Sequence, residues 1–476
     1  MGTPRKLPTN LLEALPADVD VRCDGEELSA LADDLAYRGR APLAVIRPAT
    51  VDSLAEALPL LARHGIAVVA RGGGLTYSAG YVIADRAHVV VELRRFASIA
   101  FAPDHAQVLE IGAGATWAEV HAWAAARNLR LCFRGPASGL FATVGGSAST
   151  DAVGLGSGRY GSLADQLRGL EIATGTGEIL RMGSLTDGRR ETPHGRFGPD
   201  PMGLFVGDCG AFGIKTKVAL PVAPVGGPAA FGACTFDDAP SQEAALAALA
   251  ASGLCEDIIA LHSPFPDEDS QPACIEFATD PATRAAALEH CTAHGGREAE
   301  AALVAELYHN PCPAPAMMVG PGGTRWLPVH GIVARTRHGE AMAAVRQTLR
   351  DHSQLMKREG LTCGLSSMAV GRDRLLVEPS LFVPDRPPRM IRRYLPADQA
   401  DTLRARPACP TAEAAGDRLR RDLIRALDSC GAQHLQIGRL YPFRSRLDAA
   451  ADALLATLKS HLDPHGILNP GVFGYP

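Results

Sequence analysis

The chain has 476 residues, of which 46% are hydrophobic and 21% are charged, and its formal net charge is −5 at pH 7. This balance is typical of a globular protein with a substantial core, and the length predicts two large domains or three small ones. The slightly acidic charge argues against a surface built to bind nucleic acid or an anionic membrane.

The eleven cysteines form no Cys-x-x-Cys pair, which argues against a zinc knuckle and a thioredoxin-like site. Scattered cysteines in an odd number indicate reduced thiols in a cytosolic setting. The first twenty residues hold no apolar stretch of signal-peptide length, and no window approaches the roughly 18 apolar residues of a membrane span. We therefore expect a cytoplasmic protein with no membrane span.

Between residues 42 and 225 the pattern predicts alternating strands and helices. An amphipathic helix is expected over 52–64, where Gly65 ends it. Thr116 and Glu119 have the spacing of a capping box, so a second helix should run to about residue 127. The expected strands are 42–47, 66–70, 89–93 and 108–111, followed by a hairpin of 169–174 with 178–181.

From residue 226 the texture changes to alanine-rich helical stretches and separate strands, which predicts an α+β domain. The expected helices are 242–251, 283–292 and 340–352, and the expected strands include 274–277 and 375–378. The segment 384–410 is rich in Pro and Arg and is expected to be a surface loop. A last helix should follow Leu447.

Three glycine-rich turns lie in the first region, at 71–78, 143–150 and 207–216. Consecutive glycines let the backbone approach a ligand closely, and successive N–H groups form a concave nest for phosphate oxygens. Thr76 and Ser78 would add hydroxyl donors to the first turn. The alternative for each segment is a tight turn that holds no ligand.

Two other nucleotide sites are excluded by their sequence context. The segment 156–161 has the G-x-G-x-x-G spacing, but it follows small polar residues instead of a strand and opens no apolar helix. A P-loop needs a Gly-Lys dipeptide, which occurs nowhere in the chain.

Taken in order, these motifs resemble the FAD-binding domain of the vanillyl-alcohol oxidase / p-cresol methylhydroxylase (PCMH) superfamily, which has glycolate-oxidase-like and D-lactate-dehydrogenase-like members. The resemblance runs through 43–48, 71–74, 112–117, 143–146, 207–216 and the C-terminal segment 462–471. It implies an α+β fold in which a PCMH-type FAD-binding domain of two α/β subdomains is joined to an α+β cap domain. The implied boundaries are an N-terminal extension at 1–41, the FAD-binding domain at 42–225, the cap at 226–445 and a returning C-terminal segment at 446–476.

The resemblance implies that the first two turns hold the FAD diphosphate and that the third contacts the adenosine half. The flavin ring would lie at the junction with the cap and face the substrate. The cofactor residues implied in this way are Arg71, Gly72, Gly73, Gly74, Leu75, Thr76, Ser78, Pro136, Thr143, Gly145, Gly146, Ser149, Gly213, Ile214 and Asn469.

The chain departs from the family pattern at several places. Leu75 stands where members that tether FAD from the first turn carry His, and Cys132 lies in a context unlike that of a cysteinyl flavin. The metal-binding signatures of glycolate and D-lactate dehydrogenases are missing from the second domain, so we predict no metal. The stretch 158–183 is similar to the phenol-oxidising branch, although Ser162 replaces its frequent Asp.

Oxidation of an alcohol by a flavin needs a group that receives the hydroxyl proton. A strand over 325–330 would place Trp326 and His330 on one face, and alternation over 434–441 would give a second polar strand facing the flavin. For each histidine the alternative is a structural hydrogen-bonding role. The catalytic candidates are His330, His434, Arg439 and Tyr441.

These observations predict an FAD-dependent enzyme that oxidises a CH–OH group, in an alcohol or a 2-hydroxy acid, by hydride transfer to flavin N5. One alternative is a 4-alkylphenol or benzylic alcohol oxidase or hydroxylase that passes electrons to a cytochrome. Another is a flavin-binding subunit that is active only with a redox partner. The partners expected are a small-molecule substrate and an electron acceptor, either a cytochrome or O2, with no nucleic acid; a homodimer stays open.

Overall fold

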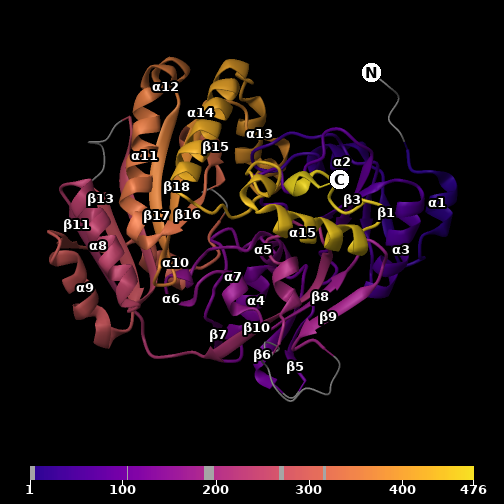
Figure 1. The fold of residues 1–476 in the computed structure, drawn as a ribbon, viewed down its shortest axis with the longest axis horizontal. Coiled ribbons are helices and arrows are strands. Elements are labelled where there is room, and N and C mark those ends of the chain that lie inside the picture. Colours follow the sequence, from indigo (N-terminus) through magenta and orange to yellow (C-terminus); the bar gives the residue numbers. More distant parts are fainter. Residues whose placement is uncertain (1–5, 104, 187–197, 267–272, 315–317, 476) are drawn as a thin grey trace.

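The computed structural model describes residues 6–103, 105–186, 198–266, 273–314 and 318–475 (Figure 1). Three sheets form two halves. Two smaller sheets and their helices make the first half, and one large sheet carries the cap. Among the described residues, no helix combines the length and the apolar character needed to cross a bilayer.

The first half contains a four-stranded sheet and a six-stranded sheet. The four-stranded sheet has the order β1-β2-β4-β3. Strands β2, β4 and β3 are parallel to one another, and β1 pairs with β2 in the antiparallel direction. Its strands are β1 (Asp20–Arg22), β2 (Val45–Arg47), β3 (Ala67–Arg71) and β4 (His88–Glu92). The six-stranded sheet is antiparallel and comprises β5 (Ile99–Ala102), β6 (His105–Gly112), β7 (Leu129–Leu131), β8 (Gly169–Ala173), β9 (Ile179–Gly183) and β10 (Ile214–Pro224).

Short and medium helices surround these two sheets, and the last long helix returns to them from the far end of the chain (Figure 1). They are α1 (Thr9–Ala14), α2 (Gly25–Leu31), α3 (Val51–Arg63), α4 (Trp117–Ala125), α5 (Val144–Thr150), α7 (Leu163–Gln166) and α15 (Ala449–Leu462). The one-turn helix α6 (Ser157–Tyr160) packs instead against two strands of the cap sheet. The C-terminal segment also joins the sheet directly, since the N–H of Val68 donates to Ile467 O at 2.7 Å.

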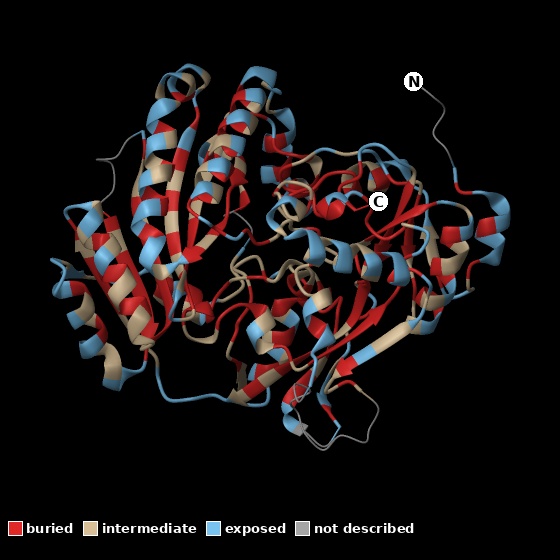
Figure 2. Cartoon of the chain, in the orientation of Figure 1, coloured by how far each residue is buried: buried red, intermediate tan, exposed pale blue. Residues whose placement is uncertain are grey.

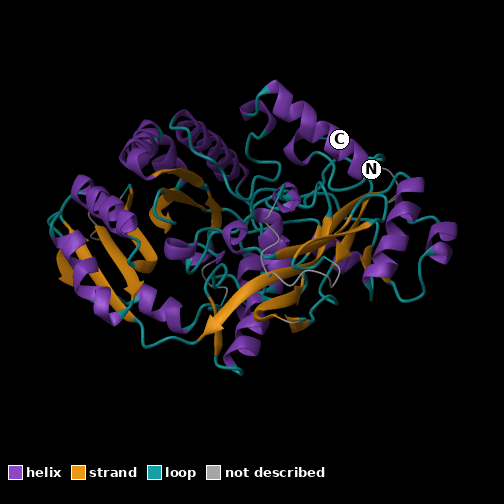
Figure 3. Cartoon of the chain, turned by 60° about the horizontal axis from the view of Figure 1, so that its bottom comes forward, coloured by secondary structure: helices purple, strands orange, loops and turns teal. Residues whose placement is uncertain are grey.

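The cap is an eight-stranded sheet in the order β14-β11-β13-β12-β17-β18-β15, with β16 also paired to β18. Its strands are β11 (Ala230–Phe236), β12 (Cys255–Phe265), β13 (Ala273–Thr279), β14 (Arg297–Ala299), β15 (Arg325–Pro328), β16 (Gly331–Ala334), β17 (Thr362–Val370) and β18 (Arg374–Val383). Helices α8 (Ala239–Ser252), α9 (Arg284–Thr292), α11 (His338–Asp351) and α14 (Pro410–Ser429) cover the outer face (Figure 3). The remaining cap helices are α10 (Leu303–His309), α12 (Ser353–Glu359) and α13 (Ala397–Ala405).

Local sequence signals account for much of this arrangement. Thr116 caps α4 and receives the N–H of Glu119, whose carboxylate accepts the N–H of Thr116, so the expected capping box is confirmed. The helix after residue 50 and the β8–β9 hairpin are also confirmed. Each outer cap helix buries one face against the sheet and exposes the other, as Figure 2 shows.

Three local expectations are wrong. Residues 144–150 form helix α5 instead of a turn, because the Thr143 hydroxyl caps it. The segment 384–410 contains α13 and buries Met390 and Ile391, because it packs against the N-terminal segment. Residues 434–441 form no strand: Gln436 has φ of +53°, and the segment crosses from the cap to the first half as a loop.

Strand alternation decides which cap side chains face inward. On β17, Cys363 and Leu365 join the core under α14, whereas Ser366 and Met368 point to the opposite face. The same period of two applies on the neighbouring strands β12, β18 and β15. Their inward residues are Ile259, Leu261, Leu376, Glu378 and Trp326.

A pair of buried histidines lies behind this inward face, under the outer helices. The Ser367 hydroxyl is 2.9 Å from His262 Nε2 and 2.9 Å from His338 Nε2, and Gln242 contacts His262 Nδ1 at 2.6 Å. Burial lowers the pKa of His338 to about 4 and that of His262 well below its ordinary value. Both rings are therefore neutral in the folded protein at neutral pH.

This pair predicts a loss of stability in mild acid. Below pH 6.5 the unfolded chain protonates both rings while the folded chain does not, so the free energy of unfolding falls as pH falls towards 4. Each ring should contribute a loss of about 2 kcal/mol between pH 7 and pH 5. Urea unfolding should show a flatter pH dependence for His338→Gln. The exposed control His294→Gln should behave like wild type, and equal slopes in all three proteins would contradict this account.

Candidate functional site

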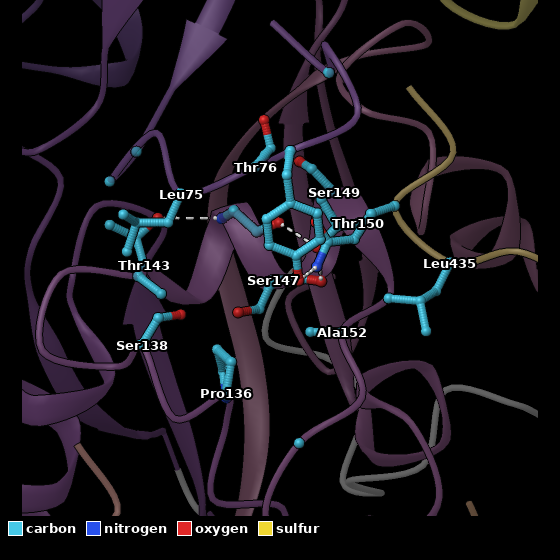
Figure 4. Close-up of a pocket in the computed structure, with 18 of the residues that line it drawn as sticks. Leu75, Thr76, Pro136, Ser138, Thr143, Ser147, Ser149, Thr150, Ala152 and Leu435 are labelled. Atoms are coloured by element: carbon cyan, nitrogen blue, oxygen red, sulfur yellow. Dashed lines mark hydrogen bonds between the residues drawn. The ribbon is translucent and has the colours of Figure 1, made fainter. Parts of the chain in front are cut away.

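A cavity of about 380 Å³ lies where the cap meets the first half, and all three glycine segments reach it. Of the fifteen residues assigned to the cofactor, thirteen line it: Arg71, Gly72, Gly73, Gly74, Leu75, Thr76, Pro136, Thr143, Gly145, Gly146, Ser149, Gly213 and Ile214. In Figure 4, side chains from α5 and the first turn surround the pocket, and Leu435 and Leu75 stand on opposite sides.

The first glycine turn presents a row of free backbone donors. Arg71 donates to the carbonyls of Gly72 and Gly73, so these oxygens are turned towards the buried guanidinium. Among the described residues, no acceptor pairs with the backbone N–H groups of 72–76. Five successive unpaired N–H groups beside a cavity are the donor set of a phosphate nest.

Helix α5 supplies the second side of the cavity. A side chain at Gly146 would meet only the Thr143 hydroxyl, at 3.1 Å, and would otherwise enter open space. Gly145, in contrast, is packed against Ala113. The missing side chain at Gly146 therefore leaves space in the cavity for a ligand, whereas the missing side chain at Gly145 allows α5 to pack closely against Ala113.

Gly73 also serves packing. A Cβ at Gly73 would collide with the backbone of Phe141, so the absence of a side chain allows the turn to approach the segment before α5. Gly73 thus lets the turn pack closely against this backbone, and it also lines the cavity.

The third turn is held by a buried ion pair. Lys215 contacts the carboxylate of Asp208, which also accepts the N–H groups of Gly210 and Phe212 at 2.9 and 3.1 Å. Lys459 of α15 binds Ala211 O at 2.8 Å from the other side. This network fixes the backbone that carries Gly213 and Ile214 to the cavity.

Ser78 and Asn469 do not line the cavity. Asn469 Nδ2 donates to Gly80 O and Cys209 O, both at 2.6 Å, and therefore joins the first and third turns. The carbonyl of Ser78 accepts the N–H of Arg439 at 3.0 Å. Both residues therefore stabilise the glycine turns through contacts outside the cavity lining.

The cap contributes a cluster of polar side chains around His330. His330 Nε2 lies 3.3 Å from Glu378 Oε2, and His330 Nδ1 is buried without a partner. The Tyr77 ring lies 5.1 Å from both His330 and Trp326, and its hydroxyl accepts Gln436 Nε2 at 3.0 Å. All five side chains line the cavity.

Burial determines the protonation of this cluster. Burial, reinforced by the charge of Glu378, raises the pKa of Tyr77, which therefore stays neutral. Burial acts to raise the pKa of Glu378 too, but the charge and hydrogen bond of His330 outweigh it and the pKa is lowered. Glu378 is thus ionised at neutral pH.

Three of the four predicted catalytic residues lie outside the cavity lining. His434 Nδ1 contacts His330 O at 2.5 Å, and the Tyr441 hydroxyl accepts the N–H of His330 at 2.9 Å. The two rings stack 4.2 Å apart. Arg439 binds the carbonyls of Ala79 and Pro470. The structure brings only His330 of this set into the cavity.

Sequence reasoning missed Glu378, whereas Tyr77 and Gln436 lie within the segments 71–78 and 434–441 that it assigned to the site without giving either residue a role. Tyr77 was visible as the residue after Thr76 in the first turn, but no local signal connects Glu378 with His330, 48 positions away. Their proximity depends on the pairing of β15 and β18. Among the described residues, no group of three or more His, Cys, Asp or Glu side chains is arranged to hold a metal ion.

The chain's own residues fit FAD. The free N–H groups of 72–76 suit the diphosphate, and Gly146 leaves space beside it. We expect Gly146→Val to fold but to lose most of its FAD, because the branched side chain would occupy that space. Flavin absorbance per chain and the melting temperature measure the two effects separately.

Gly25→Val is the matched control, because Gly25 also lies in the first turn of a short helix and a Cβ there meets nothing within 4 Å. It should keep its flavin. Full FAD retention by folded Gly146→Val would show that this glycine does not face the cofactor.

Comparisons with known proteins agree with this geometry. Residues 42–183 match the family model of an FAD binding domain. Glycolate oxidase subunit GlcD of Escherichia coli (strain K12) is 27% identical over 246 residues, or 51% of this chain and 46% of that protein. D-2-hydroxyglutarate dehydrogenase of Xanthomonas citri pv. viticola is 26% identical over 304 residues, or 62% of this chain and 56% of that protein. The chain thus spans about half the length of the curated relatives it matches.

Solved structures share the fold over almost the whole chain. p-Cresol methylhydroxylase with substrate bound superposes with a TM-score of 0.76 at 15% identity, covering 98% of this chain and 96% of that one. 4-Ethylphenol oxidase from Gulosibacter chungangensis, in its isoeugenol complex, has a TM-score of 0.71 at 16% identity, covering 96% and 94%. Residues 42–183 are thus matched to an FAD-binding domain in sequence, and the two-half architecture is matched in structure, so the chain is similar to the vanillyl-alcohol oxidase / p-cresol methylhydroxylase superfamily of FAD proteins.

Proposed function

We propose that the protein is an FAD-dependent oxidoreductase that oxidises a CH–OH group of a small molecule, with His330 receiving the hydroxyl proton. The observation that carries this proposal is the position of His330. It is a buried imidazole that lines the cavity, is paired on one side with a carboxylate and has an unpartnered nitrogen on the other. The named activities of the matched relatives, on glycolate and D-2-hydroxyglutarate, are also oxidations at CH–OH carbon.

Glu378 determines the tautomer of His330 in this proposal. An ionised carboxylate 3.3 Å from Nε2 favours the tautomer with its hydrogen on that nitrogen, which leaves the lone pair of Nδ1 free to accept a proton. The Ser380 hydroxyl donates to Glu378 Oε1 at 3.1 Å and so holds the carboxylate in place. The arrangement is an acid–base pair oriented by a third group, as general-base catalysis requires.

The other predicted candidates orient His330 without receiving the proton. The Tyr441 hydroxyl binds the N–H of His330 and the His434 ring binds its carbonyl, so both peptide groups of the residue are fixed. Tyr77 stays neutral and contributes a hydroxyl and a ring face. We therefore assign His434 and Tyr441 positioning roles.

The substrate would lose one hydride from carbon and one proton from oxygen to give a carbonyl product. FAD, bound along the first turn and α5, supplies the two-electron acceptor for the hydride. The free N–H groups of 72–76 would hold the diphosphate.

His330→Ala should lower the rate of anaerobic flavin reduction by roughly 10²–10⁴-fold, the range for loss of a general base. Glu378→Gln should lower it less, since the imidazole remains, and should shift its pH profile. His352→Ala is the matched control: His352 also pairs with a carboxylate, Asp422, at 2.9 Å, but does not line the cavity. Normal reduction rates in a folded, flavin-loaded His330→Ala protein would remove the histidine from the mechanism.

The substrate class is tested by bleaching of the flavin under anaerobic conditions with alcohols, 2-hydroxy acids and 4-alkylphenols. Bleaching by a CH–OH donor supports the proposal. Bleaching by alkylphenols alone would favour the phenol-oxidising alternative, and bleaching by none of them would favour a subunit that needs a partner.

We also expect FAD to be held without a covalent bond. Leu75 lines the cavity at the tethering position, and the cap residues His434 and Tyr441 do not line it. Acid precipitation should therefore release the flavin into the supernatant. Flavin that stays with the precipitated chain would contradict this expectation.

A further inference from the structure

Part of the cap half of the cavity is an apolar wall. This wall, called the cap wall below, is formed by aliphatic and methionine side chains of β12, β17, β18 and α10, which carry no hydrogen-bonding nitrogen or oxygen. They are Ile259, Leu261, Leu303, Leu307, Met368 and Leu376. Burying methylene groups against such a wall is favourable in proportion to the apolar area removed from water.

Among the described residues, the cap contributes no Lys or Arg side chain to the cavity lining. The two cations that do line it belong to the first half and already have anionic partners: Arg71 binds Glu92 at 2.8 Å, and Lys215 binds Asp208. A carboxylate bound at the cap wall would find no free cation.

Two other buried arginines lie nearby but do not line the cavity. Arg420 donates to the carbonyls of Tyr77 and Pro328 at 2.7 and 2.8 Å. Arg439 is held by the carbonyls of Ala79 and Pro470. Neither side chain is presented to a substrate.

The carboxylate of Glu378 lies at the cap half of the cavity. Glu378 is ionised, and an anionic substrate beside it would meet like-charge repulsion in addition to its own desolvation cost. The polar groups beside it suit a neutral group instead: Gln436 Oε1 is a buried acceptor without a partner, and Ser366 contributes a hydroxyl to the cavity lining. A hydroxyl can use both kinds of atom without bringing in a charge.

We propose that the substrate is an uncharged alcohol with an extended apolar group, which contacts the cap wall, and that 2-hydroxy acids and phenolates are excluded by charge. This inference rests on the proposed function and deepens it. It separates the chain from the hydroxy-acid activities named for its sequence relatives, because the feature that would bind a carboxylate is missing from the described lining.

The first test is equilibrium binding of 1-alkanols and the matched n-alkanoates to the FAD-loaded protein at pH 8, by calorimetry. For the alcohols, Kd should fall about fourfold per added methylene until the cap wall is filled. At equal chain length the alkanoate should bind at least about tenfold more weakly. Alkanoates that bind as tightly as alkanols, or an alcohol series without chain-length dependence, would overturn the inference.

A gain-of-function variant gives an independent readout. Met368→Lys places a flexible cation on the cap wall, and it should tighten alkanoate binding about tenfold or more while weakening alkanol binding. Met368→Gln, similar in length and uncharged, is the matched control and should not favour the alkanoate. Leu303→Lys repeats the test from α10 if the first variant does not fold, and failure of every folded lysine variant to favour alkanoates would count against the inference.

The experiments distinguish failure of the proposed oxidation from failure of the proposed substrate preference. If neutral alcohols bind in the predicted order but never bleach the flavin, the proposed function is wrong and the binding preference stands. If a 2-hydroxy acid binds more tightly than its matched alcohol and bleaches the flavin, oxidation at CH–OH stands and the substrate inference is wrong.

Discussion

The buried guanidinium of Arg71 is the group on which the cofactor side of the cavity depends. Its side chain is almost fully enclosed, and it binds Glu92, the carbonyls of Gly72 and Gly73, and the Tyr394 hydroxyl. Burial acts to lower its pKa, but Tyr394, Tyr81 and Glu92 raise it, so the charge is retained. Because the guanidinium attracts the carbonyls of the turn, the N–H groups on the other side stay free for a phosphate.

The first turn is supported from distant parts of the chain. Asp34, in the N-terminal segment, accepts the N–H groups of Ala36, Tyr37 and Ala79, and so ties the end of the turn to the start of the chain. Burial raises the pKa of Asp34 to about 6, although the three N–H donors and Arg420 act to lower it. Arg389, from the segment predicted to be a surface loop, pairs with Asp33 at 3.0 Å. The N-terminal extension and the 384–410 segment are therefore structural parts of the cofactor site.

Three buried polar atoms without partners lie at the junction between the halves. Arg71 Nε, His330 Nδ1 and Gln436 Oε1 are buried without partners, and all three residues line the same cavity. A buried polar atom without a partner costs about 1–3 kcal/mol, so their grouping at one place indicates a binding site and not a packing defect. The same region keeps its only described cap carboxylate, Glu378, beside His330, which joins the acid–base pair to a surface that is otherwise apolar.

The sequence alone determined the cofactor half, because its signals are local. A capping box, a strand followed by three glycines and a hairpin turn each depend on neighbouring residues, and thirteen of the fifteen residues that the family resemblance implied for FAD line the cavity. The catalytic side was decided by tertiary structure. The alternation predicted over 434–441 failed because this segment crosses between the halves, and the contact of His330 with Glu378 depends on strand pairing across 48 positions. Local patterns determine which backbone groups a turn can present, whereas the pairing of distant strands decides which side chains meet across a cavity.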